Sequence, residues 1–238
     1  MAADRVGLTW RGELAGEILR HLDAIDALEV IAEDWLQSPR RHLDALADLA
    51  RARPLTLHGV SLGLASAAPV DGARLERLAR LVGRVQPAGW SEHLAFVRGG
   101  GVELGHLAAP PRTPHTVAGA VANLRRAAQA VGLPPALENV ATLIDPPCST
   151  LGEAAWIGAT VQGAGAPLLL DLHNLWANAV NFGHDAQALL HALPLDRVAE
   201  VHLAGGRWWG WGSCGPLRRR TTGRSTRAPR WACRSWKR

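Results

Sequence analysis

Residues 168–174 have the sequence LLLDLHN, in which an apolar run of strand length ends at an aspartate. The arrangement recurs in LTLHG (55–59), WSEHLAF (90–96), ALENV (136–140) and VAEVHLAGG (198–206), where a histidine or carboxylate stands near the C-terminal end of a short apolar run. In a barrel of parallel strands these ends lie on one face, so side chains far apart in the sequence meet there. The five segments therefore predict a parallel sheet with a site at its carboxyl ends.

The chain up to residue 206 alternates short apolar runs with amphipathic stretches. We expect strands at 6–10, 28–35, 55–60, 90–97, 136–140, 168–172 and 198–203, and helices at 13–27, 40–53, 72–85, 117–131, 150–163 and 185–193. Such alternation predicts parallel βαβ units. Seven strands in this order favour an α/β fold, a TIM-type (β/α)8 barrel truncated after the seventh strand, because no eighth apolar run follows Gly206. The two edges are then left open or covered by another chain.

The overall composition indicates a globular protein. Of the 238 residues, 47% are hydrophobic and 20% are charged, which is typical of a folded domain. The opening MAADRVGLTW lacks the basic and apolar regions of a secretory signal, and no apolar run is long enough to span a bilayer. We expect a soluble, cytoplasmic protein without a membrane partner.

The composition changes abruptly at the end of the predicted barrel domain, residues 1–206. Residues 207–238 form a basic, Trp/Arg-rich tail that holds ten of the 26 Lys and Arg and none of the 21 Asp and Glu. Basic residues interleaved with Trp could bind nucleic acid through phosphates and stacking. We favour another interpretation, a non-native tail from a shifted reading frame, because GC-rich codons read out of frame yield Arg, Gly, Pro, Ser, Trp and Cys. Nucleic acid is therefore not an expected partner.

The polar residues at the predicted strand ends are candidate metal ligands: His58, His93, Glu138, Asp171 and His202. Several carboxylates and histidines can be buried together only if their charges are compensated, and a cation is the simplest compensation. The three cysteines show no metal-binding spacing, and imidazole and carboxylate without thiolate suit iron, manganese or zinc.

Two further acids lie in the predicted second strand. Glu29 and Glu33 would share one face of that strand by its period of two. Glu33 is nearer the expected catalytic end, where we expect it to form an ion pair in the barrel mouth.

In order and spacing, the segments LTLHGVSLGLASAAPVD, WSEHLAFV, ALENVATL, LLLDLHNLWANAVNFG and DRVAEVHLAGG resemble the motifs of the DUF692 family. This is a family of multinuclear non-heme iron-dependent oxidases that includes the methanobactin biosynthesis oxidase. The likeness spans residues 5–206. It implies a TIM barrel with two or three iron ions. It also implies the use of dioxygen to modify residues, often Cys, of a ribosomally made precursor peptide presented by a partner protein.

The resemblance implies a ligand set as well. The positions that match family ligands or their neighbours are His58, His93, Glu138, Asn139, Asp171, His173, Asn174 and His202. Glu138 and Asp171 would be the catalytic carboxylates. Many relatives have Asn where His173 and Asp34 stand here. After residue 206 the family continues with a His and Asp region and an eighth strand bearing a Glu, which this sequence lacks, so we expect impaired activity.

Three functions remain open at this point. The first is an iron-dependent peptide-modifying oxidase or a truncated derivative of one. The second is a divalent-metal hydrolase or isomerase of the endonuclease IV and xylose isomerase type, which shares the barrel and uses similar ligands. The third is a catalytically inactive scaffold that binds a partner. Metal analysis separates the first two.

Overall fold

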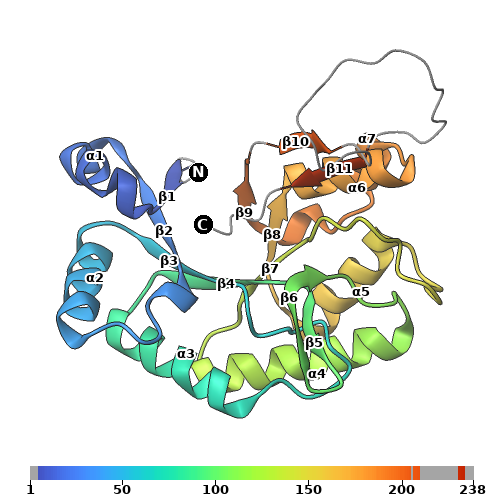
Figure 1. Ribbon diagram of the computed structural model, residues 1–238, viewed down its shortest axis with the longest axis horizontal. Coiled ribbons are helices and arrows are strands. Elements are labelled where there is room, and N and C mark those ends of the chain that lie inside the picture. The colour runs from blue at the N-terminus through green and yellow to red at the C-terminus, as the bar shows by residue number, and fades with distance from the viewer. Residues whose placement is uncertain (1–4, 205, 210–229, 234–238) are drawn as a thin grey trace, which may run out of the picture.

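The computed structural model describes residues 5–204, 206–209 and 230–233. A seven-stranded parallel sheet has the order β1-β2-β3-β4-β7-β8-β9. The strands are β1 (Gly7–Thr9), β2 (Ala27–Ile31), β3 (Leu55–Gly59), β4 (Gly89–His93), β7 (Ala136–Glu138), β8 (Leu168–Asp171) and β9 (Val198–His202). Figure 1 shows the sheet curved into an open barrel, with β1 and β9 at its two ends. The expected barrel of seven strands is confirmed.

Helices cover the convex side of this sheet (Figure 1). They are α1 (Ala15–Arg20), α2 (Arg40–Ala52), α3 (Gly72–Val85), α4 (Pro114–Val131), α5 (Glu153–Ala164), α6 (Leu172–Phe182) and α7 (Ala186–His191). The core between the layers contains fully buried strand residues such as Leu55, Leu57 and Leu168, packed with helix residues such as Leu75. Each such side chain contributes about 1.5–3 kcal/mol by leaving water.

The sequence analysis missed helix α6 altogether. The expected helix at 185–193 corresponds only to α7, whereas α6 begins directly where β8 ends. Asp171 makes this abrupt change possible, because its Oδ1 accepts a hydrogen bond from Asn174 N at 2.8 Å and so caps the helix.

Other boundaries also differ from the expected ones. The second strand ends at Ile31, and the chain then forms a 3-10 turn, η3 (Ala32–Asp34). The stretch expected to be a loop after the fourth strand contains a hairpin of β5 (Phe96–Gly99) and β6 (Val102–Ala108). Gly100 and Gly101, with φ of 57° and 81°, make the turn that a residue with a side chain rarely adopts.

The expected helix at 13–27 is broken into three short pieces. These are η1 (Gly12–Leu14), α1 and η2 (Leu22–Ala24). A further 3-10 turn, η4 (Leu195–Arg197), leads into β9.

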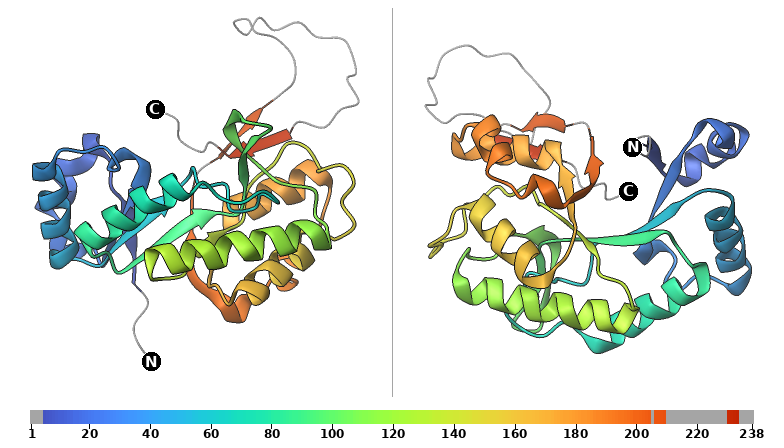
Figure 2. Two further views of the ribbon diagram at one scale, coloured as in Figure 1. Left: turned by 90° about the horizontal axis from the view of Figure 1, so that it is seen from below. Right: turned by 180° about the vertical axis from the view of Figure 1, so that it is seen from behind.

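Two short strands lie in the region of the basic tail, the first of them beginning one residue before it. β10 (Gly206–Trp209) pairs antiparallel with β11 (Arg230–Cys233) in a separate two-stranded sheet, and β11 lies beside α6 (Figure 2). We expected no strand here, because the tail lacks alternating apolar residues. That expectation is wrong for these segments, since a ladder forms between main-chain groups and does not require alternation. The rest of the tail lies outside the described residues.

The strands at the two ends of the large sheet carry exposed apolar side chains. Within the described residues, β1 pairs only with β2 and β9 only with β8. Leu8 of β1 is 51% exposed, and Val201 of β9 is 49% exposed. Unpaired parallel edges with apolar side chains favour association with other chains.

No helix in the described part of the chain is long and apolar enough to span a membrane.

We expect the chain to self-associate through these two edge strands. The substitutions Leu8→Lys and Val201→Lys should reduce this association, because a charge opposes edge-to-edge pairing. Size-exclusion chromatography with light scattering measures the effect. Leu195→Lys, at an exposed apolar residue outside the strands, is the control. A wild-type chain that stays monomeric at micromolar concentration would contradict the prediction.

Candidate metal centre

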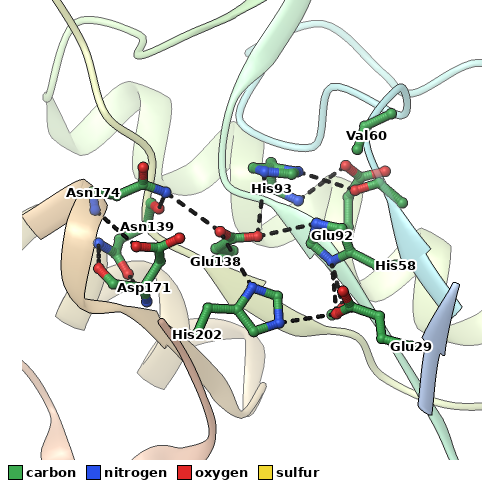
Figure 3. Close-up of polar contacts among 12 residues, drawn as sticks. Glu29, His58, Val60, Glu92, His93, Glu138, Asn139, Asp171, Asn174 and His202 are labelled. Carbon is green, nitrogen blue, oxygen red and sulfur yellow. Dashed lines mark hydrogen bonds and ion pairs between the residues drawn. The ribbon is translucent and has the colours of Figure 1, made fainter. Parts of the chain in front are cut away.

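Glu138, the last residue of β7, lies among three histidine rings from three other strands (Figure 3). Its Oε2 is 3.1 Å from His58 Nε2 and 3.2 Å from His93 Nε2. Its Oε1 is 3.7 Å from His202 Nδ1. The structure thus brings the carboxyl ends of β3, β4, β7 and β9 together around one buried carboxylate.

The other nitrogens of His58 and His93 are held by the barrel wall. His58 Nδ1 lies 2.7 Å from Ser91 Oγ, and His93 Nδ1 donates to Gly59 O at 3.1 Å. A carbonyl oxygen can only accept, so Nδ1 of His93 carries the proton. Burial lowers the pKa of His93, and in its neutral form Nε2 presents a lone pair to Glu138.

The contact between His93 and Glu138 therefore joins two electron-rich atoms. Glu138 Oε2 is buried and has no hydrogen-bond partner among the described residues. A ring lone pair and a carboxylate oxygen at 3.2 Å repel one another unless a cation or a proton lies close to both. The residues present fit a metal ion.

Among the described residues three sets of side chains could hold an ion; one is Glu29, Glu200 and His202, and the other two include Glu138. His58, His93 and Glu138 each offer one ligand atom within 4.8 Å of the others, and so do Glu138, Asp171 and His202. Glu138 belongs to both sets and could bridge two ions. All the donors are imidazole nitrogen or carboxylate oxygen, a combination that suits iron, manganese or zinc.

The two asparagines of the expected ligand set reach the centre but bind protein groups there. Asn139 exchanges two hydrogen bonds with the main chain of Asp171, at 3.0 and 2.8 Å. Asn174 Nδ2 donates to Glu138 Oε1 at 3.3 Å and to Asn139 O at 2.8 Å. Asn139 thus fixes the main chain at Asp171, and Asn174 contacts the carboxylate of Glu138. His173 lies outside all three sets, and its Nδ1 accepts from Ala204 N at 2.8 Å.

The carboxylates and rings shift one another's protonation. Burial alone would lower the pKa of His58, but Glu138 and Glu29 outweigh it and raise the pKa to about 9. Burial also opposes the charge of His202, and three carboxylates raise its pKa to about 12. Burial raises the pKa of Asp171 to about 6. His58 and His202 therefore carry protons that an ion would have to displace, whereas the neutral ring of His93 does not.

Glu29 and Glu33 were expected to share one face of the second strand, with Glu33 nearer the catalytic end, but Glu29 is the one that reaches the centre. Glu29 lies on β2, is 7% exposed, and its Oε2 is 2.9 Å from His202 Nε2. Glu33 lies in η3 beyond the end of β2, where its Oε1 accepts from Val60 N at 3.0 Å. The assumed period of two stopped at Ile31. A charged residue inside the apolar run ALEVI was the available indication that Glu29 faces the interior.

Glu92 is a second buried acid that the sequence analysis did not select. It is 1% exposed, and its two oxygens accept from His93 N at 2.9 Å and Leu62 N at 3.1 Å. Burial and Glu33 raise its pKa to about 8. A Cβ at Gly59 would lie 2.7 Å from Glu92 Oε2, so a larger residue there would displace this carboxylate.

Asparagines on one face of α6 hold the segment that follows Glu138. Asn178 Nδ2 donates to Val140 O at 2.9 Å and to Glu153 Oε1 at 2.8 Å, and its Oδ1 accepts from Thr142 N at 2.8 Å. Asn178 is fully buried. The spacing of four residues places Asn174 and Asn178 on the same side of the helix.

An open parallel barrel with a buried cluster of histidines and carboxylates at its strand ends is the framework of a metal-dependent enzyme. The chain belongs to the family described as RiPP precursor modification enzyme MbnB/TglH/ChrH, whose profile matches residues 5–222. A UPF0276 protein of Paraburkholderia phytofirmans is 36% identical over 200 residues, 84% of this chain and 65% of that protein. One from Streptomyces avermitilis is 38% identical over 209 residues, 84% of this chain and 42% of that protein. The chain spans less than two thirds of each.

Solved structures show the same fold at low sequence identity. A D-psicose 3-epimerase from Clostridium cellulolyticum H10 has a TM-score of 0.57 and 12% identity, covering 84% of this chain and 72% of that one. A 3-keto-D-glucoside 4-epimerase from E. coli has a TM-score of 0.52 and 14% identity, covering 85% of this chain and 80% of that one. These similarities confirm the TIM-type fold alone.

We expect Asn178→Leu to lower the free energy of unfolding by about 1–3 kcal/mol or more, because it leaves buried main-chain groups of the segment after Glu138 without partners. Urea unfolding measures the change. The control is Gln162→Ala, at an exposed position of α5. Equal stability of the two variants would show that the asparagine does not hold this segment.

Proposed function

We propose that the chain is an iron- and dioxygen-dependent oxidase that modifies residues, often Cys, of a ribosomally synthesised precursor peptide presented by a partner protein. The observation that carries the metal assignment is the buried Glu138 Oε2, which faces two ring nitrogens and has no hydrogen-bond partner within the described part of the chain. Membership of a family of RiPP precursor modification enzymes supports the peptide substrate.

In this proposal Glu138 is the shared ligand of two ions. His58 and His93 complete one side, and Asp171 and His202 the other. Asn139 would hold the main chain of Asp171, because both atoms of its amide already bond there, and Asn174 would hold Glu138 through its Nδ2. His173 would reach an ion only through Nε2, since its Nδ1 accepts from Ala204 N.

The burial of the ligands indicates where a substrate would approach. The side chains of His58, His93 and Glu138 are 5%, 9% and 3% exposed, whereas that of His202 is 23% exposed. In this chain the centre is therefore most accessible from the side of β9, which forms one open edge of the sheet among the described residues. Iron held there would supply the activation of dioxygen, and the protein groups would fix the ions and exclude water on the β3 and β4 side.

We expect protein supplied with iron to bind it and His93→Ala to lose most of it, because this substitution removes a ligand whose ring is already oriented by Gly59 O. Metal analysis by mass spectrometry measures the content. His106→Ala changes a histidine on β6 and is the matched control. Iron retained in His93→Ala would sink the ligand assignment. Zinc or manganese bound in preference to iron would favour the hydrolase or isomerase alternative. Protein that binds no metal at all would favour the inactive scaffold.

We also propose that the tail at 207–238 is not native and impairs activity. Its basic, Trp-rich composition without acidic residues is the basis for this proposal. Replacing it with the C-terminal segment of a longer relative should raise both dioxygen consumption and the mass shift of a Cys-containing precursor peptide incubated with its partner protein. The same replacement in a Glu138→Gln background should show neither. Full activity of the 238-residue chain would overturn this view of the tail.

A further inference from the structure

The three rings around Glu138 share one arrangement, in which one nitrogen faces Glu138 and the other faces the barrel wall. For His58 the wall group is Ser91 Oγ, and for His93 it is Gly59 O. His202 is turned the other way round, with Nδ1 towards Glu138 and Nε2 towards Glu29 (Figure 3). Glu29 therefore occupies, for His202, the place that Ser91 and Gly59 occupy for the other two rings.

The carboxylate of Glu29 is placed to accept from this ring. Thr9 Oγ1 donates to its Oε1 at 3.0 Å and fixes one end. Its Oε2 is buried, has no hydrogen-bond partner among the described residues, and lies 2.9 Å from His202 Nε2. The distance suits a charge-assisted hydrogen bond from the ring to the carboxylate.

His202 needs such a partner more than the other two rings do. It lies on β9, which has one sheet neighbour among the described residues, and it is the most exposed of the three. A charged acceptor also makes the opposite ring nitrogen a better donor to a metal.

We propose that Glu29 is a positioning residue that orients His202, so that Nδ1 of this ring is directed to the metal centre. This inference rests on the metal centre of the proposed function. Glu29 would not touch the ion. It would act through the ring, and Thr9 would in turn hold Glu29.

The test uses the full chain and cobalt(II) alone as the probe, titrated by its visible absorption, which reports both affinity and ligand geometry. We expect Glu29→Gln to weaken cobalt binding about 10- to 100-fold, the usual cost of losing such a partner, and to change the absorption spectrum. Thr9→Val keeps the charge of Glu29 but removes the hydrogen bond that holds its Oε1. We therefore expect a smaller loss of cobalt affinity and a change of the absorption spectrum in the same direction. If Glu29→Gln fails to fold, Thr9→Val decides the question.

Two controls separate this role from a general structural one. Glu33→Gln changes a neighbouring acid that also has a buried, unpartnered oxygen but bonds to Val60 N, and should bind cobalt like the wild type. Glu200→Gln changes an acid whose Oε1 is 3.7 Å from the same nitrogen, and we expect a weaker effect than that of Glu29→Gln.

Unchanged cobalt affinity and spectrum in both Glu29→Gln and Thr9→Val would overturn the inference and leave the metal centre intact. A loss in Glu200→Gln as large as that in Glu29→Gln, together with one fewer ion bound, would also overturn it, because Glu29 would then be a ligand of a separate ion. A wild-type chain that binds neither cobalt nor iron would refute the proposed function itself.

Discussion

The arrangement of the carboxyl ends of the barrel depends on one buried carboxylate and the three imidazole rings around it. Glu138 is 3% exposed, and no arginine or lysine is paired with it in the described chain. An isolated buried carboxylate is unstable, so it must be compensated by protonated rings or by a metal ion. Four strands that are distant in sequence supply the groups that meet this requirement, and their parallel arrangement makes the convergence possible.

Much of the surrounding structure serves to hold these groups in place. Ser91 and Gly59 O orient two of the rings, and Glu92 fixes the main chain at His93 from the other face of β4. Asparagines on α6 secure the other side of Glu138 and the segment that follows it. These contacts are hydrogen bonds to buried main-chain and carboxylate groups, which are costly to leave unmade. These protein contacts therefore fix the positions of the side chains of the centre.

The fold and the principal side chains could be predicted because their pattern is local. Short apolar runs ending in His, Glu or Asp identified the strands, and the parallel topology predicted that His58, His93, Glu138, Asp171 and His202 would lie at one end. Helix α6 was missed because Asp171 acts both as a residue of the site and as the cap of the following helix. No spacing rule separates those two roles.

Other features depended on where each strand stops and on tertiary contacts. Glu33, rather than Glu29, was expected nearer the catalytic end, but β2 ends at Ile31, four residues before the end of the predicted strand at 28–35. Asn139 and Asn174 were expected as ligands by resemblance, which stays a prediction; in the structure Asn139 bonds to the main chain of Asp171, and Asn174 bonds through Nδ2 to Glu138. Such choices between binding a metal and binding a neighbour are decided by side-chain direction, which a single sequence does not contain.

X-ray absorption spectroscopy at the iron edge tests the central claim most directly, because it identifies the atoms that surround the bound metal. The account predicts a shell of nitrogen and oxygen with the scattering pattern of imidazole and without sulfur, and predicts that Glu138→Gln abolishes or strongly alters it. Iron coordinated by sulfur, or a spectrum unchanged in Glu138→Gln, would contradict the assignment of Glu138 as the shared ligand of the centre.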